Sequence, residues 1–150
     1  MSDEIKHECG VALIRLLKPL EYYQLKYGTW KYGLQKLYLL MEKQHNRGQD
    51  GAGIASLKLD PEPGNEYLHH VRSIDPSAIN DVFQTIYSQF NDHNQQSDRI
   101  SDPVWAKANI PFAGELLLGH LRYGTHGKNK LENVHPVTRI NNWKTRNLVL

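Results

Sequence analysis

Short apolar runs that alternate with two amphipathic segments are the feature that most constrains how this chain can fold. The strand-like runs lie at 11–17, 53–59, 66–74 and 115–121. Residues 31–44 and 75–90 instead place apolar side chains at the i, i+3, i+4 and i+7 spacing of a helix with one buried face. The alternation predicts an α+β fold in which helices cover a sheet.

Proline and glycine mark the expected breaks between these elements. Residues 60–65 hold two prolines and a glycine, which predicts a turn that closes a hairpin between the two flanking runs. Pro19 and Gly28 interrupt residues 18–32, so we expect an irregular surface excursion there. Asp75 is expected to cap the second helix, with proline in its first turn.

The remaining segments carry weaker signals. Residues 91–103 are polar and lack periodicity, which predicts a surface loop. Residues 105–112 are expected to pack back onto the domain loosely, and the apolar residues 147–150 are typical of a further strand.

Composition limits the class of protein. A chain of 150 residues that is 39% hydrophobic is long enough for one soluble domain with a core. No apolar run approaches the roughly 20 residues that cross a bilayer, and the first residues resemble neither a secretory signal nor a transit peptide, so we expect a cytoplasmic protein. A net charge of +2 is too small to indicate a surface that binds nucleic acid.

Cys9 is the one cysteine of the chain, and it comes directly before the first apolar run. A single cysteine excludes an internal disulfide and a multi-cysteine zinc site, which leaves reactivity as its chemical use. Thiols titrate near about 8.5 and α-amino groups near about 7.7–8.0. If residues 1–8 were removed, the new amine of Cys9 could serve as the base for its own thiol. The alternative is a small buried cysteine at the start of a strand.

Four pieces of sequence occur in order along nearly the whole chain: Cys9-Gly10-Val11, His45–Ile54, Gly119–Gly127 and Asn133–Pro136. Together they resemble the N-terminal glutaminase domain of the class II glutamine amidotransferases. The Arg-Gly-Gln-Asp motif within the second piece looks most like that of the amidophosphoribosyltransferases, which catalyse the first step of purine synthesis.

The resemblance implies a fold and an activity. The fold would be a four-layer α/β/β/α sandwich of the N-terminal-nucleophile hydrolases, truncated at its C-terminal side. Residues 1–8 would be a propeptide removed autocatalytically, and residues 9–150 an incomplete glutaminase domain. The activity would be hydrolysis of glutamine to glutamate and ammonia through a cysteinyl thioester, with ammonia passed to phosphoribosyl pyrophosphate on a missing C-terminal domain.

The resemblance also assigns residues. Cys9 would be the nucleophile, and Arg122 would hold the α-carboxylate of glutamine, a task suited to the paired donors of a guanidinium. Thr125 and His126 would line the glutamine pocket. Arg47 and Gly48 would form a wall near the nucleophile. The alternative for the two arginines is an ordinary surface salt bridge.

Among the eight histidines, a metal site built from His120, His126 and His135 is a further interpretation. Strand alternation and the lack of a suitably spaced carboxylate favour ordinary core or turn histidines. A cysteine–histidine dyad that uses His7 as base is also open. We therefore expect no cofactor or metal in this domain, with Mg²⁺ only in the missing phosphoribosyl domain.

The chain also departs from the family pattern. Asn46 is an extra residue in the usual His-Arg-Gly run, and the family's oxyanion-hole Asn-Gly pair would lie beyond Leu150. Loss of one oxyanion donor costs about 10²–10³ in rate, so the piece alone is expected to be inefficient. Two other readings stay open: the glutaminase domain of a glucosamine-6-phosphate synthase, and a non-catalytic regulatory domain with this fold. The full-length enzyme is expected to be a homo-oligomer that binds neither nucleic acid nor membrane.

Overall fold

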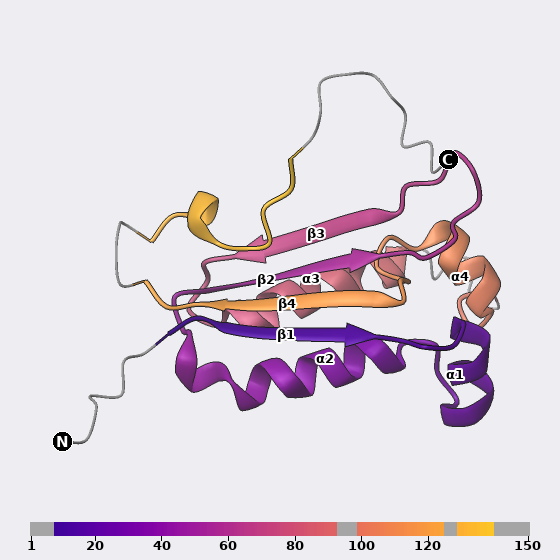
Figure 1. Cartoon of the computed structure of the whole chain (residues 1–150), viewed down its shortest axis with the longest axis horizontal. Helices are drawn as coiled ribbons and strands as arrows, with labels where there is room; N and C mark the ends of the chain where they lie inside the picture. Colours follow the sequence, from indigo (N-terminus) through magenta and orange to yellow (C-terminus); the bar gives the residue numbers. More distant parts are fainter. Residues whose placement is uncertain (1–7, 93–98, 125–128, 140–150) are drawn as a thin grey trace.

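One antiparallel sheet organises the structure, a computed structural model that describes residues 8–92, 99–124 and 129–139. Its strand order is β1-β4-β2-β3, and each neighbouring pair is antiparallel (Figure 1). The strands are β1 (Gly10–Arg15), β2 (Gly51–Leu57), β3 (Leu68–Ser73) and β4 (Leu116–Arg122). The described residues therefore form a small α+β protein, as the alternation of strand-like and helical segments predicts.

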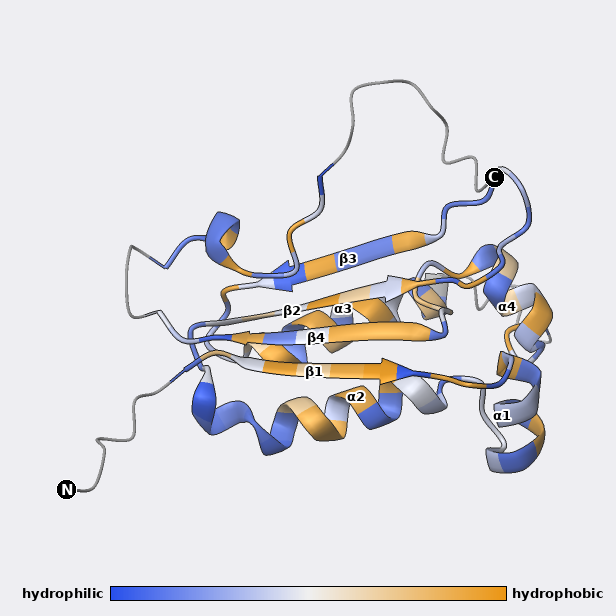
Figure 2. Ribbon diagram, in the orientation of Figure 1, coloured by the Kyte–Doolittle hydropathy of each residue, from blue (hydrophilic) through white to orange (hydrophobic). Residues whose placement is uncertain are grey.

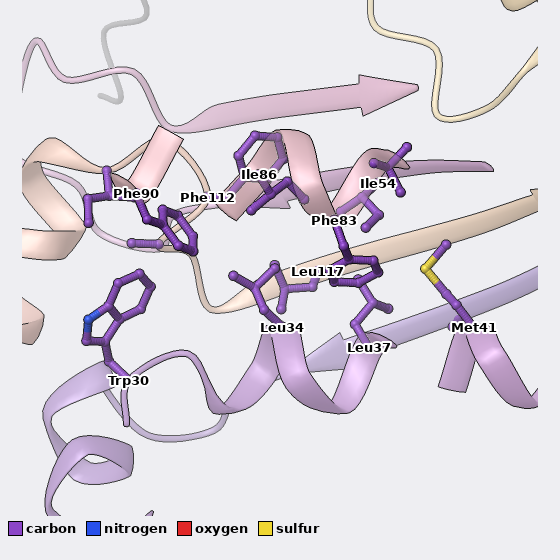
Figure 3. Close-up of a cluster of buried hydrophobic side chains, with 14 of the residues drawn as sticks. Trp30, Leu34, Leu37, Met41, Ile54, Phe83, Ile86, Phe90, Phe112 and Leu117 are labelled. Carbon is purple, nitrogen blue, oxygen red and sulfur yellow. The ribbon is translucent and has the colours of Figure 1, made fainter. Parts of the chain in front are cut away.

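Two helices, α2 (Tyr32–Lys43) and α3 (Ala78–Asp92), cover one face of this sheet (Figure 1). The first packs on β1 and β4, and the second packs on β2 and β3. Figure 3 shows their apolar side chains directed toward each other and toward the sheet. Fully buried members of this core include Leu37, Ile86 and Leu117. Both helices lie where the apolar periodicity predicts them.

The predicted hairpin is present. β2 and β3 pair from Ala52 opposite Ser73 to Leu57 opposite Leu68. Gly64, in the connecting turn, has a φ of 90°, a left-handed conformation that glycine adopts at little cost. The helix after the hairpin begins two residues later than expected, at Ala78, and the Asp75 carboxylate accepts a hydrogen bond from the Ser77 amide in the turn before it.

The prediction of an irregular segment at residues 18–32 is wrong. The expected irregular segment contains α1 (Leu20–Tyr27), with Pro19 at its N-cap and Gly28 at its C-cap. Gly28 has a φ of 75°, and its amide donates to the carbonyl of Gln24, which is a usual way to end a helix. The proline and glycine therefore bound a helix and do not break one.

Residues 105–112 also differ from expectation, since they pack tightly. They overlap α4 (Pro103–Asn109), whose N-cap Asp102 accepts hydrogen bonds from the amides of Val104 and Trp105. Ile110, just after the helix, is fully buried. A capped first turn with proline at its start was a readable signal for this helix. The final predicted strand, 147–150, lies outside the described residues.

The other face of the sheet carries exposed apolar side chains. Val11 and Leu13 on β1 are 59% and 62% exposed, and Figure 2 shows hydrophobic residues along much of β1 and β4. Within the described ranges the protein has a single sheet, so the second sheet of a four-layer sandwich stays a prediction. No helix in those ranges has the length and hydrophobicity needed to span a bilayer.

His69 on β3 makes folding stability depend on pH. Burial lowers the pKa of this imidazole, and the nearby Lys58 cation acts in the same direction. The unfolded chain therefore binds the proton more readily than the folded chain, so this contribution to stability is present above the ordinary histidine pKa and is lost as pH falls below it. We expect His69→Gln to flatten the decline in unfolding free energy between about pH 7 and pH 5, by at most about 1.4 kcal/mol per pH unit.

Urea denaturation at several pH values measures this slope. His70→Gln is the matched control, because His70 is the next residue on the strand and is exposed. If both variants keep the original slope, His69 does not cause the pH dependence.

Candidate functional site

Cys9 and the end of β4 meet at one end of the sheet. The Tyr123 amide donates to the Cys9 sulfur at 3.4 Å, and the thiol donates to the Tyr123 carbonyl at 3.9 Å. Cys9 itself is exposed. The contact follows from strand register, since Gly10 pairs with Leu121 and the residues just outside that pair continue alongside each other. An exposed thiol is thus held against backbone 114 residues away in sequence.

Arg122 is the last residue of β4 and is only 8% exposed. One Nη1 hydrogen of its guanidinium is donated to the Asn133 carbonyl at 2.6 Å. The side chain lies on the uncovered face of the sheet, because Leu121 beside it points into the core. Arg122 therefore places a cation near the strand end that contacts Cys9. Because this cation is nearly buried, solvent screens its charge only weakly.

The glycine-rich segment after α2 packs against this strand end. It contains the short 3-10 helix η1 (His45–Arg47), which accommodates Asn46, and then Gly48. A Cβ on Gly48 would lie 2.7 Å from the Leu121 carbonyl carbon and oxygen, so only glycine allows this approach. Arg47 beside it is exposed.

Asp50 holds the same strand end from two sides. Its amide donates to the Arg122 carbonyl at 3.0 Å, and its carboxylate accepts a hydrogen bond from the Gly124 amide at 2.7 Å. These bonds continue the β2–β4 ladder and fix the backbone on both sides of Tyr123, the residue that contacts the thiol. Asp50 is the last residue of the Arg-Gly-Gln-Asp motif, but the sequence analysis assigned it no part in the site.

A second segment crosses the uncovered face of the sheet. It follows η3 (Leu131–Asn133), and Arg72 of β3 donates to the Val134 carbonyl at 3.1 Å. A Cβ on Gly53 would lie only 2.0 Å from the His135 carbonyl oxygen, so the absent side chain makes room for the crossing. The last residue of η3, Asn133, supplies the carbonyl that accepts from Arg122, which the sequence analysis did not anticipate because the two are joined only by tertiary contact.

The predicted site residues are thus partly gathered. Cys9, Arg122 and Gly48 lie at the same end of the sheet, where β1 and β2 begin and β4 ends (Figure 1). The Arg47 side chain is exposed at the edge of this region. Thr125 and His126 lie outside the described residues.

His120 is buried on β4, as expected of a core histidine, but one of its ring nitrogens has no hydrogen-bond partner. It lies on β4 opposite Val11 and Gly53, with its side chain on the uncovered face. Its Nδ1 is buried and has no hydrogen-bond partner. The ring of His135 lies 5.1 Å away between centroids. Burial lowers the pKa of His120, and the neighbouring His135 and Arg122 lower it further.

The arrangement holds a potential nucleophile and a cation at one strand end. An exposed sulfur is held in place by the backbone of Tyr123, and the residue before Tyr123 is the nearly buried Arg122. No family model, curated protein or solved structure matches this chain.

Proposed function

We propose that this chain is a glutaminase domain of a class II glutamine amidotransferase. The observation that carries the proposal is the contact between Cys9 and the backbone of Tyr123, because it joins the expected nucleophile to the strand end that carries the expected carboxylate-binding Arg122. Residues so distant in sequence need not meet. Their meeting at an exposed strand end is what the proposed chemistry requires.

The mechanism starts after removal of residues 1–8. The α-amine of Cys9 accepts the thiol proton, and the sulfur attacks the side-chain amide carbon of glutamine. The amine then returns the proton to the leaving nitrogen, so that ammonia departs and a thioester remains. Water attacks the thioester with the same amine as base, which releases glutamate and regenerates the thiol.

Substrate binding uses charge. The Arg122 guanidinium would pair with the α-carboxylate of glutamine, and its burial strengthens that charge-assisted hydrogen bonding. Gly48 and Asp50 would support the strand end that carries Arg122 and Tyr123. Thr125, His126 and Arg47 are proposed to line the rest of the pocket on the resemblance alone, as is phosphoribosyl pyrophosphate as the acceptor of ammonia.

The proposal includes the finer fold. A second sheet would pack on the part of the uncovered face around Leu13, beside the segment that crosses this face at 134–137, which would complete a four-layer sandwich. The exposed apolar side chains of that face support this completion, since burying them would remove apolar surface from water.

A labelling experiment tests the function. A chain that begins at Cys9 is treated with an electrophilic ketone analogue of glutamine, and with the same electrophile lacking the α-amino and α-carboxylate groups. We expect a single adduct on Cys9, formed much faster with the glutamine analogue, because Arg122 concentrates it at the thiol. Intact-mass and peptide mass spectrometry locate and quantify the adduct.

Two variants sharpen this result. Cys9→Ala should abolish the adduct, and Arg122→Gln should remove the preference for the glutamine analogue while general thiol alkylation continues. Equal rates with both electrophiles would contradict a glutamine site. Retention of residues 1–8 in the mature protein, read from its mass, would exclude the amine of Cys9 as the base.

A further inference from the structure

Two imidazoles face each other in a pocket on the uncovered side of the sheet. His120 comes from β4 and His135 from the crossing segment, with ring centroids 5.1 Å apart and ring planes at 65°. The pocket has a volume of about 340 Å³ and is otherwise lined by apolar side chains, among them Val11, Leu118 and Val137. The two imidazoles are therefore polar side chains in an otherwise apolar pocket.

The state of His120 points to a ligand. The side chain is more than nine-tenths buried, at 8% exposure, and its Nδ1 has no hydrogen-bond partner. Buried polar atoms are nearly always satisfied, so an unpartnered ring nitrogen in a residue that lines the pocket is an unusual feature. His135 is exposed, so its ring can turn to share a ligand with His120.

We propose that His120 and His135 bind one divalent transition-metal ion such as Zn²⁺, Ni²⁺ or Co²⁺. Two imidazole nitrogens bound to a tetrahedral ion at about 2.0–2.1 Å hold their ring centroids about 5 Å apart. The observed centroid separation of 5.1 Å leaves room for an ion between the two rings once their nitrogens turn toward it. The site does not depend on the proposed glutaminase activity and involves neither Cys9 nor glutamine.

The neutral imidazole is the form that coordinates metal. Arg122 lies two residues from His120 on the same face of β4, and its cation repels a metal ion. Its Nη1 hydrogen bond to the Asn133 carbonyl fixes one end of the guanidinium.

The donor set limits the metal. Among the described residues, no group of three or more His, Cys, Asp or Glu side chains is placed to hold an ion together, so solvent would complete the coordination. Imidazole nitrogen suits Zn²⁺, Ni²⁺, Cu²⁺ and Co²⁺, whereas Mg²⁺ and Ca²⁺ prefer oxygen. We therefore expect transition metals to bind and Mg²⁺ and Ca²⁺ not to bind.

Metal titration of the 150-residue chain tests the site. Zn²⁺ and Ni²⁺ are titrated by calorimetry, and Co²⁺ by its visible absorption, which reports nitrogen coordination. His135→Ala removes an exposed ligand without opening the core, so it should fold normally. Even an outer-shell partner is worth about 10–100-fold in metal affinity, so the loss of one ligand of two should weaken binding at least about tenfold.

Two controls separate this pair from other donors. His70→Ala removes an exposed histidine elsewhere on the sheet, and Cys9→Ser removes the thiol; both should bind as the unmodified chain does. One ion per chain that is lost with His135→Ala supports the site. Absence of binding at millimolar metal overturns it. So does binding that survives His135→Ala, or that is lost in either control.

Discussion

Replacement of Leu37 by alanine is expected to lower the free energy of unfolding by about 2–5 kcal/mol. Leu37 has no exposed surface and lies at the centre of the contact between α2 and the sheet (Figure 3). A Cβ on Gly119 of β4 would be 3.1 Å from a Leu37 methyl group, so helix and strand are already close there. The truncated side chain would leave a cavity that this tight contact cannot refill.

The size of this loss is large relative to total stability. Domains are stable by about 5–15 kcal/mol, so the variant is expected to lose a substantial fraction of its stability and to unfold at a lower urea concentration. Leu39→Ala on the same helix is the matched control, since Leu39 is 51% exposed and should change stability by less than about 0.5 kcal/mol. Urea unfolding followed by circular dichroism measures both variants. Similar losses in the two would show that α2 does not pack through Leu37.

Replacement of Gly48 by alanine is expected to cost about 1–3 kcal/mol and to disturb the end of β4. The new Cβ would lie 2.7–2.8 Å from backbone atoms of Leu121 and Arg122, which cannot turn aside as a side chain can. The φ of Gly48 is −157°, an extended value open to any residue, so the cost arises from contact alone. The loop must move away from β4.

That movement would reach the candidate site. The two hydrogen bonds of Asp50, to the Arg122 carbonyl and from the Gly124 amide, would weaken together. Hydrogen exchange at the Asp50 and Gly124 amides reports this loss, and urea unfolding reports the stability. Gly64→Asn is the control, because a side chain there meets nothing within 4 Å and asparagine tolerates left-handed φ. If Gly48→Ala matches this control in stability and exchange, the loop does not brace β4.

The two errors about secondary structure have a common cause. Residues 18–32 and 105–112 lack a long apolar stripe, so periodicity alone gave no helix in either. In the structure, α1 and α4 are short helices set by their ends, with Gly28 closing one and Asp102 opening the other. The same residues that signal turns also bound helices, and a single sequence does not say which use applies.

The residues of the candidate site were also only partly predictable from the sequence. The sequence motifs around Cys9, Arg122 and Gly48 identified residues that lie together at one end of the sheet in the structure. It did not identify Asp50 or the Asn133 carbonyl as their partners, because backbone groups carry no signature in the sequence. At His120 the sequence favoured an ordinary core histidine, and only the tertiary structure shows that its buried Nδ1 has no hydrogen-bond partner.

The amino-acid pattern by itself determined the strands, the two long helices and the face that each helix buries, because side-chain periodicity depends only on local backbone geometry. Tertiary structure alone decided which strands are neighbours, where Cys9 meets Tyr123 and how His135 comes to face His120. Those outcomes depend on register between segments far apart along the chain, and register is set by the packing of the whole sheet against its helices.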